Sequence, residues 1–399
     1  MEKKNQVPKY PHLRFPEFTD EWKEVTLGEV AAFFSGGTPS TYNKTFYKGD
    51  IPFIRSGEIH DSRTELAISK EAVEGSSAKI VFVGDILLAL YGATSGDIAI
   101  SKMRGAINQA ILCIRPSSEI DRDFLFFIWE YRKEDIVRKY IQGGQGNLSA
   151  EIVKNIPLRL PSLAEQRKIA GLLSLIDERI EVQNAIIKER EAQKAALLRR
   201  LFDRTLRFPE FTDEWKEVKL GEVAEIIGGG TPSTTTTNYW DGEIVWFNPS
   251  EIGKKKYVSN SNRTISFQGL SNSGARLLPK GTVLLTTRAT IGEIAIANVE
   301  CTTNQGFQSV VTGHEANNEY VYYFLSTQKV YLLRHSSGST FLETPSSVIR
   351  NLPLRLPSLP EQKKIAALLS ALDERIAVET EYAALLQKQK AYLLRQMFV

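Results

Sequence analysis

The chain has 399 residues, of which 42% are hydrophobic, 24% charged and 10% aromatic. These values are typical of folded globular protein, and the length predicts about two or three domains. Disordered, collagen-like and fibrous classes are therefore excluded. The formal net charge of +3, from 50 basic and 47 acidic side chains, neither requires nor excludes a nucleic-acid partner. Any DNA-binding face must be local.

No segment approaches the roughly 18 uninterrupted apolar residues that a membrane-spanning helix needs. The first residues, Met1–Gln6, are polar and lead into prolines, unlike a secretory signal. We therefore expect a cytoplasmic protein with no membrane partner. The two cysteines, Cys113 and Cys301, are too few for a disulfide framework and adjoin apolar runs, so we expect reduced, buried thiols.

The sequence contains an internal duplication, which begins with a nearly perfect repeat. Residues 14–30 return as residues 207–223 with one change, Thr26 against Lys219, at an offset of 193 residues. This spacing is far longer than the roughly 20–50 residues of stacked repeats. It indicates two whole domains joined head to tail.

Two further segments carry the duplication along the chain. Residues 36–41 recur as 229–234 at the same offset of 193, whereas residues 155–180 recur as 351–376 at an offset of 196. Of the 26 positions in the latter pair, 20 are identical. The second copy has therefore gained three residues between these landmarks, while the landmarks themselves have changed little.

In chain order, each copy begins with a β-rich region, over about 14–160 and 207–356. Short β-type runs alternate there with Gly, Pro, Ser, Thr and Asn clusters, and a few stretches have apolar residues at helical spacing, which predicts α+β domains. The predicted strands include 79–88 and 281–285, and the predicted helices are 123–139 and 318–335.

Each copy ends in a long helical pattern. Pro161–Gln166 and Pro357–Gln362 resemble helix starts, with a serine cap and Glu or Gln three to four residues on, positioned to pair with free amide groups. Apolar residues then follow a 4-3 repeat interrupted by charged positions, and such a seam is too weak for a lone helix, so the two helices should pack on each other. About 40 residues make a rod of roughly 60 Å. The repeated positions are Leu173, Ile176, Ile180, Gln183, Ile187, Arg190, Lys194, Leu197 and Leu201, and Leu369, Leu372, Ile376, Glu379, Ala383, Leu386, Lys390, Leu393 and Met397.

These motifs together resemble the specificity subunit of type I restriction-modification enzymes. The resemblance rests on Trp22–Val30, Gly36–Ser40 and Leu160–Ala170, each with its second-copy twin, and covers nearly the whole chain. It implies two α+β target-recognition domains related by a pseudo-twofold axis and separated by two long antiparallel helices that form a coiled-coil spacer. The corresponding segments are 1–160 (recognition domain 1), 161–204 (central helix), 205–356 (recognition domain 2) and 357–399 (C-terminal helix).

The resemblance further implies a non-catalytic reader of double-stranded DNA. Each recognition domain would read one half of a bipartite, asymmetric target, and the helices would set the gap. The chain would recruit two modification subunits, which methylate adenine with S-adenosylmethionine, and two ATP-driven restriction subunits that use Mg. It would bind none of these cofactors itself.

The residues give independent support for a protein without catalytic chemistry. The sequence has no phosphate-binding loop, no His-Glu-x-x-His and no paired Cys-x-x-Cys, and its four histidines lack metal-ligand spacing, so we predict no metal site. The string nearest to an adenine-methyltransferase motif, Phe247–Ser250, lacks the second proline and the aromatic residue that clamp a flipped base. An enzyme with its own nuclease or methylase site therefore conflicts with the sequence.

Base-reading side chains should lie where the two copies differ, because the two half-sites need not match. The divergent windows are about 42–50 and 235–243, 60–79 and 253–276, 91–105 and 287–300, and 141–149 and 337–345. They contain Arg, Lys, Asn and Gln donors suited to base edges or phosphates. Lys254–Lys256 is either a phosphate-facing loop or an ordinary solvated turn. The candidates are Lys44, Lys48, Arg63, Lys79, Arg104, Gln145 and Asn147 in the first copy, and Lys254, Lys255, Lys256, Arg263, Arg276 and Arg288 in the second.

Two other features allow a DNA-binding and a structural interpretation. The turns Gly36–Ser40 and Gly229–Ser233 could hold a phosphate with backbone amides, or could be tight turns that need positive φ. The aromatic side chains could stack on bases or pack in the core, which is the default for β-rich segments. These aromatics are Tyr91, Trp240, Trp246 and Tyr257.

The starts of the two long helices are nearly identical in the two copies, whereas the divergent windows differ between them. We expect them to bind two identical partner subunits, although recent duplication alone would also explain their identity. The candidates are Glu165, Gln166, Lys168, Arg179, Glu361, Gln362, Lys364 and Arg375. A rival hypothesis is a scaffold of two β-rich modules that bind proteins or glycans; salt-dependent affinity for duplex DNA would favour the DNA reader.

Overall fold

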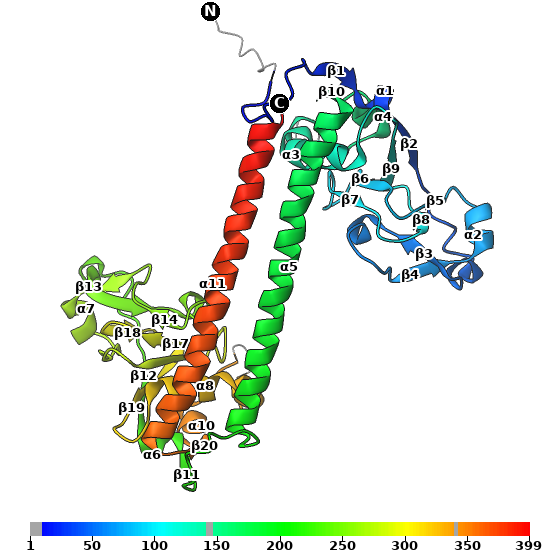
Figure 1. Ribbon diagram of the computed structural model, residues 1–399. Helices are drawn as coiled ribbons and strands as arrows, with labels where there is room; N and C mark the ends of the chain where they lie inside the picture. The colour runs from blue at the N-terminus through cyan, green and yellow to red at the C-terminus, as the bar shows by residue number, and fades with distance from the viewer. Residues whose placement is uncertain (1–9, 141–146, 339–341) are drawn as a thin grey trace, which may run out of the picture. The chain divides into compact units, whose positions relative to one another are not determined.

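The chain divides into two units. The computed structural model describes residues 10–140, 147–338 and 342–399. One unit, unit 1, comprises Met1–Asn184 with Glu381–Val399, and the other, unit 2, comprises Ala185–Thr380 (Figure 1). Each unit therefore combines the β-rich region of one copy with pieces of both long helices.

The β-rich part of unit 1 contains three sheets. A two-stranded antiparallel sheet pairs β1 with β10, a four-stranded sheet has the order β2-β9-β6-β7, and a second four-stranded sheet has the order β4-β3-β8-β5. The elements are β1 (Lys23–Thr26), α1 (Leu27–Val30), β2 (Ala31–Ser35), η1 (Lys44–Tyr47), β3 (Ile51–Ile54), η2 (Ser56–Glu58), β4 (Leu66–Ile68), α2 (Lys70–Glu74), β5 (Lys79–Val81), β6 (Ile86–Ala89), β7 (Ile98–Ile100), β8 (Gly105–Ile107), β9 (Ile111–Pro116), α3 (Arg122–Tyr140), α4 (Ala150–Lys154) and β10 (Pro157–Leu160).

Unit 2 repeats this plan with local changes. Its sheets are β11-β20, β12-β19-β16-β17-β14 and β15-β13-β18. Both copies are thus mixed α+β, which confirms the predicted fold class. The elements are β11 (Lys216–Lys219), α6 (Leu220–Val223), β12 (Ala224–Gly228), η3 (Thr237–Tyr239), β13 (Trp240–Phe247), η4 (Pro249–Glu251), β14 (Tyr257–Val258), β15 (Thr264–Ile265), α7 (Phe267–Ser271), β16 (Val283–Thr286), β17 (Ile294–Ala297), β18 (Cys301–Thr303), β19 (Phe307–Thr312), α8 (Asn318–Ser326), α9 (Lys329–Arg334), α10 (Ser346–Arg350) and β20 (Pro353–Leu356).

Two predicted elements are divided in the structure. The strand expected over 79–88 is β5 followed by β6, because Gly84 turns the chain between them with a φ of 93°. The helix expected over 318–335 is α8 followed by α9, and the backbone N–H groups of Thr327 and Gln328 bond to carbonyls three residues back, as in a tightened last turn. In unit 1 the corresponding helix, α3, is continuous and confirms the prediction over 123–139.

The two long helices are α5 (Leu163–Phe202, 40 residues) and α11 (Leu359–Met397, 39 residues), as the 4-3 pattern predicts. Within each unit the first part of one helix lies beside the last part of the other, so the pair is antiparallel (Figure 1). In unit 1, Lys390 of α11 binds Asp177 of α5 at 2.8 Å. In unit 2, Lys194 of α5 pairs with Asp373 of α11. Charged positions of the seam therefore pair across the two helices.

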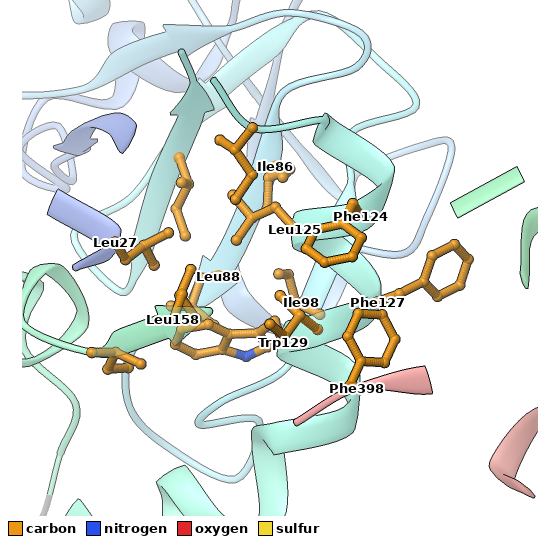
Figure 2. Packing of buried hydrophobic residues seen from close by; sticks show 14 of the residues in the cluster. Leu27, Ile86, Leu88, Ile98, Phe124, Leu125, Phe127, Trp129, Leu158 and Phe398 are labelled. Carbon is orange, nitrogen blue, oxygen red and sulfur yellow. The ribbon is translucent and has the colours of Figure 1, made fainter. Parts of the chain in front are cut away.

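The largest core of unit 1 includes residues from the end of the chain. Figure 2 shows Phe398 beside Phe124 and Phe127 of α3, and the rings of Phe398 and Phe124 are 5.2 Å apart. Trp22 lies in the same core, and its twin Trp215 lies in the core of unit 2. Because α11 ends in this core, unit 1 is complete only with residues of the second copy.

Both cysteines are free and buried, which confirms the predicted environment of their side chains. Cys113 lies in β9 and Cys301 in β18, and neither side chain is exposed. Burial raises the pKa of each thiol to about 12. The reactive thiolate is therefore scarce at neutral pH.

The paired glycine turns have a structural role other than the two expected. Gly36, Gly37, Gly229 and Gly230 do not have positive φ. A Cβ on Gly36 would instead lie 1.8 Å from the carbonyl oxygen of Ile107, and a Cβ on Gly229 would lie 2.1 Å from the carbonyl oxygen of Asn304. The N–H groups of Gly37 and Gly230 bond to strand carbonyls, so they do not face a phosphate. Glycine is needed at these positions because the chain passes too close to a neighbouring strand to admit a Cβ.

The Gly36→Ala variant should therefore lower the free energy of unfolding by about 1–3 kcal/mol, since backbone atoms must move to admit the methyl group. Gly171 is the matched control, because a Cβ there meets nothing within 4 Å and the second copy has Ala367 at this helical position. Gly171→Ala should raise stability by about 0.5–1 kcal/mol. Denaturant unfolding of both variants measures these changes, and equal stability of the two would contradict the explanation.

Candidate nucleic-acid interface

The divergent windows 42–50 and 60–79 of the first copy, and 235–243 and parts of 253–276 of the second, lie in or next to one small sheet in each unit. In unit 1 this sheet is β4-β3-β8-β5, and in unit 2 it is β15-β13-β18. Strand β3 pairs antiparallel with β4, with Ile51 opposite Ile68, and strand β13 pairs antiparallel with β15, with Ile244 opposite Ile265. The two sheets therefore provide a common register in which positions of the two copies can be compared.

A glutamate braces the loop beside this sheet in both units. In unit 1, Glu58 accepts hydrogen bonds from the backbone N–H groups of Arg55 at 3.1 Å and Glu65 at 2.9 Å. In unit 2, Glu251 accepts the equivalent bonds from the backbone N–H groups of Asn248 at 2.9 Å and Asn262 at 2.6 Å. The backbone of the loop is thus fixed in the same way in both copies, while the side chains that it carries differ.

Most of the predicted DNA-contacting side chains lie on the surface of their unit. They come from loops, short turns and strand ends, which suits contact with phosphates or base edges. The exposed candidates are Lys44, Lys48, Arg63, Lys79, Arg104, Asn147, Lys254, Lys255, Arg263 and Arg276. Gln145 lies outside the described residues.

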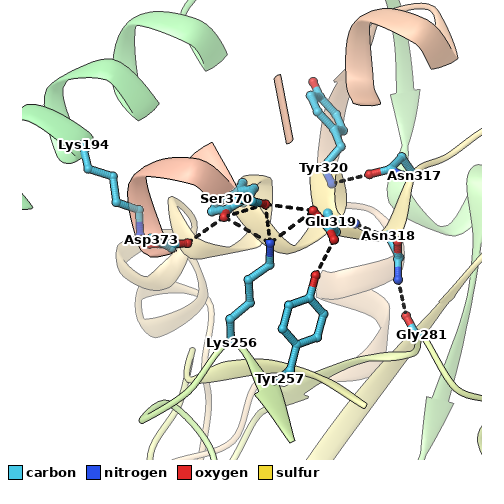
Figure 3. Close-up of polar contacts among 11 residues, drawn as sticks. Lys194, Lys256, Tyr257, Gly281, Asn317, Asn318, Glu319, Tyr320, Ser370 and Asp373 are labelled. Atoms are coloured by element: carbon cyan, nitrogen blue, oxygen red, sulfur yellow. Dashed lines mark hydrogen bonds and ion pairs between the residues drawn. The ribbon is translucent and has the colours of Figure 1, made fainter. Parts of the chain in front are cut away.

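Lys256 differs from its two neighbours and does not form part of such a surface. Its side chain is 11% exposed, and Figure 3 shows its ammonium group between Glu319 of α8 and Ser370 of α11. Lys256 Nζ donates to Ser370 Oγ at 2.6 Å, to Glu319 Oε2 at 3.1 Å and to the hydroxyl of Tyr323 at 3.2 Å. The expectation that Lys256 faces DNA is wrong, because its hydrogen-bonding capacity is used within unit 2.

The contacts of this network shift the pKa values of Glu319 and Tyr323. Burial opposes ionisation of Glu319, but hydrogen bonds from Tyr257 and Ser370 and the charge of Lys256 lower the pKa of this carboxyl group. Burial and the hydrogen bond to Asp373 raise the pKa of Tyr323. The network therefore joins β14, α8 and α11 through hydrogen bonds of Lys256, Tyr257 and Tyr323.

Arg288 is also engaged within its unit. It forms an ion pair with Glu343 at 2.8 Å, and the backbone of the two residues forms an isolated antiparallel bridge. The Arg288 side chain is partly exposed but already has a carboxylate partner. Arg288 therefore holds two loops of unit 2 together, which its appearance in a divergent window does not indicate.

The aromatic candidates are mainly core residues. Trp240 and Trp246 are buried, and their indole N–H groups donate to the carbonyls of Ser233 at 3.0 Å and Gly230 at 2.9 Å. Tyr91 is half-buried against the main core of unit 1, whereas Tyr257 is exposed and donates its hydroxyl to Glu319 (Figure 3). The structural interpretation holds for the two tryptophans, and stacking of bases on their faces is excluded in this conformation.

Four of the eight predicted partner-binding residues are buried inside their own unit. Glu165, Gln166, Glu361 and Gln362 are each at most 1% exposed. They do not form a contact surface, and this expectation is corrected. The reason is that each side chain serves a segment that is distant in the sequence.

The glutamates bind an arginine that sequence analysis overlooked. Arg14 forms two hydrogen bonds with Glu165, at 2.7 and 2.8 Å, and Arg207 forms two with Glu361, at 2.8 and 2.9 Å. These hydrogen bonds raise the pKa of both guanidinium groups. The signal was present in the sequence, because both arginines open the repeated segment at 14–30 and 207–223.

The glutamines tie the helix starts to the loop before α3 or α8. Gln166 Oε1 accepts from the N–H of Asp121 at 2.8 Å, and its amide donates to the carbonyls of Glu119 and Pro161. Gln362 makes the same three contacts in unit 2, with Asn317, Glu315 and Pro357. Packing within each copy therefore explains the identity of these residues.

The other four predicted partner-binding residues are exposed. Lys168 pairs with Glu17 and lies 4.7 Å from the ring centre of Phe15, and Lys364 has the equivalent pair with Glu210. Arg179 and Arg375 lie further along the helices and are also exposed. These side chains remain candidates for a partner surface.

Within residues 10–140, 147–338 and 342–399, no group of three or more His, Cys, Asp and Glu side chains is arranged to hold a metal ion. No helix in the described part of the chain is long and apolar enough to cross a membrane.

Each unit thus presents exposed cationic and amide side chains on a common frame, the arrangement of a duplicated binding protein. A family model for the type I restriction modification DNA specificity domain matches the chain twice, over residues 19–192 and 212–388. The chain therefore belongs to the family of type I restriction-modification specificity proteins, as its motifs suggested.

Relatives with known names belong to the same family. The MjaIX specificity subunit of Methanocaldococcus jannaschii is 36% identical over 190 residues, which span 47% of this chain and 44% of that protein, less than half of its length. The putative MjaX specificity subunit of the same organism is 24% identical over 403 residues and matches 95% of this chain and 93% of that protein. The crystal structure of a type I S subunit from M. genitalium has a TM-score of 0.62 at 15% identity and covers 98% of this chain and 99% of that one.

The Glu361→Gln variant should lower the free energy of unfolding by roughly 2–3 kcal/mol, because it leaves the guanidinium of Arg207 without its buried carboxylate. Glu210→Gln is the control, since Glu210 and its partner Lys364 are both nearly half exposed, and its cost should stay below about 1 kcal/mol. Denaturant unfolding measures both. Loss of partner assembly by a Glu361→Gln protein of unchanged stability would show instead that Glu361 contacts the partner.

The neighbouring lysines 255 and 256 should respond in opposite ways. Lys256→Met removes three internal hydrogen bonds and should lower stability by about 1–3 kcal/mol. Lys255→Met changes an exposed side chain and should alter stability by less than about 0.5 kcal/mol, while reducing the slope of DNA affinity against salt by up to about one. Unfolding and salt-titrated DNA binding together separate the two outcomes; equal behaviour would contradict the assignment.

Proposed function

We propose that this chain is the non-catalytic subunit that reads double-stranded DNA in a type I restriction-modification complex. Each copy reads one half of a bipartite, asymmetric target. The observation that carries the proposal is the common frame of the two units: the brace at Glu58 and Glu251 is retained, whereas the exposed side chains around it differ. A shared frame with different exposed donors suits two different half-sites.

The chain leaves the covalent chemistry to its partners. Two modification subunits methylate adenine with S-adenosylmethionine, and two restriction subunits use ATP and Mg. The family description, which refers to DNA specificity, and the names of the relatives, which are specificity subunits, support this division. The complex acts on cellular DNA, so its place is the cytoplasm.

The exposed parts of the helix starts recruit the partner subunits. Arg179 and Arg375 occupy equivalent positions in the two copies, as do Lys168 and Lys364. Equivalent surfaces suit two identical partners, because each copy offers the same contacts. The buried residues Glu165 and Glu361 shape these surfaces indirectly by fixing the helix starts.

The antiparallel helices set the number of unread base pairs between the half-sites. Their register is supported by Lys390 with Asp177 in unit 1 and Lys194 with Asp373 in unit 2. These are the same two positions of the repeat with the copies exchanged, since both pairs of twins differ by 196. The seam can therefore be lengthened by whole heptads without changing its pattern.

A map of methylated adenines in cells that carry the cognate modification subunit tests the proposed function. With the intact chain we expect one bipartite motif, and deletion of the chain should abolish it. A cell whose methylated motifs are unchanged by the deletion, although the modification subunit is active, would overturn the proposal.

Lengthening both helices tests the role of the spacer. One heptad inserted after Asn184 and one after Thr380 add about 10 Å, or roughly three base-pair steps. Both half-sites should keep their sequence while the gap between them grows. An unaltered gap in the lengthened protein would argue against a spacer.

A further inference from the structure

A perpendicular pair of aromatic rings occurs at the small sheet of each unit, at equivalent positions of the repeat. In unit 1 the rings of Tyr47 and Phe53 are 6.4 Å apart with an interplanar angle of 83°. In unit 2 the rings of Trp240 and Trp246 are 5.1 Å apart with an angle of 88°. The pairs correspond at the offset of 193 residues, so a common platform is larger and more electron-rich in unit 2.

The residue that lies against this platform differs between the copies. Ile68 and Ile265 occupy equivalent sites in the strand register, and the residue two positions earlier is Leu66 in unit 1 and Arg263 in unit 2. The glutamate brace gives the same alignment, because the N–H bound by each glutamate belongs to the preceding residue. An arginine thus replaces an aliphatic side chain at one defined position.

The guanidinium of Arg263 is held against the platform but remains accessible. Its Cζ lies 3.5 Å from the ring centre of Trp240 and 5.9 Å from that of Trp246, and the residue is exposed. No ion pair of Arg263 with a carboxylate occurs among the described residues. Stacking restricts the side chain while leaving its N–H donors free at the edge of the plane.

Unit 1 has an arginine, Arg55, beside the equivalent loop, but its N–H donors already bind carboxylates. Arg55 binds Glu58 at 3.0 Å through Nε and Glu65 at 2.5 Å through Nη2. In unit 2 the equivalent residues are Asn248 and Asn262, and Asn248 binds Glu251 with its own amide. The exchange removes both the competing arginine and one carboxylate, so the free guanidinium of unit 2 is Arg263.

We propose that Arg263 is a specificity-determining residue that recognises a guanine in the half-site read by the second copy. The inference rests on the proposed function and adds the base class and the residue. A planar guanidinium donates two parallel hydrogen bonds to O6 and N7 of guanine in the major groove. Because the stacked side chain is already ordered, little rotamer freedom is lost on binding.

The Arg263→Lys variant tests the proposal in the complete complex with its modification subunits. Lysine keeps the charge but loses the planar fork and the stacking geometry. The map of methylated adenines should show that one G·C position of one half-site becomes degenerate. Discrimination against other bases at this position should fall about 10- to 100-fold, and the other half-site should be unchanged.

Two controls accompany this variant. Arg334→Lys makes the same exchange at an exposed residue of α9 that is not among the DNA-contact candidates. Its methylation motif should match that of the unchanged protein. Thermal unfolding of Arg263→Lys should resemble that of the unchanged protein, because the residue is exposed. If it unfolds early, Arg263→Gln serves as the second variant, with the same expected loss at one position.

Failure of the role of Arg263 and failure of the proposed function give different results. A bipartite motif that stays fully specific in both variants would overturn the role of Arg263 and leave the DNA-reading function intact. A uniform loss of affinity, with unchanged base preference and a smaller salt slope, would assign Arg263 to a phosphate and also overturn it. If the unchanged protein directs no motif, the proposed function itself fails.

Discussion

The apolar seams of the two long helices must be removed from water, and each unit does so with residues from both copies of the repeat. In unit 1, Met397 and Phe398 from the end of the chain pack with Trp22 and Phe124. In unit 2, Phe202 at the end of α5 packs against Tyr320 with ring centres 5.1 Å apart. A long amphipathic helix is marginal by itself, so neither copy completes a unit alone. The duplication therefore produced two units that depend on each other's helices.

Charged residues within the seam define how the helices pair. Lys390 lies against Asp177 and also binds Glu130, while Lys194 lies against Asp373. A shift of one helix by a turn would leave a partly buried ammonium group without its carboxylate, and such a loss is costly. The apolar residues supply the burial, and these pairs favour one antiparallel register.

The sequence predicted the features that depend on short-range pattern. Repetition, the short β-type runs and the 4-3 spacing indicated the two α+β copies and the long helices. It could not show that Glu165 binds Arg14, because a glutamate in the first turn of a helix looks the same whether it faces water or a distant arginine. Likewise, Lys254, Lys255 and Lys256 are equivalent in sequence, and only the fold directs one of them toward Glu319. These failures share a cause: the deciding contact joins segments that lie far apart in the chain.

This distinction also explains why divergence alone identifies recognition residues poorly. A residue in a divergent window differs between the copies either because it meets a different base or because it has a different partner inside its own unit. Arg288 belongs to the second group, since a carboxylate already binds it. Hydrogen-bonding capacity that remains unused at an exposed, ordered side chain is the more selective criterion, because readout of a base requires free donors and a fixed geometry. Arg263 satisfies both requirements, as stacking on Trp240 fixes its plane without using its N–H donors.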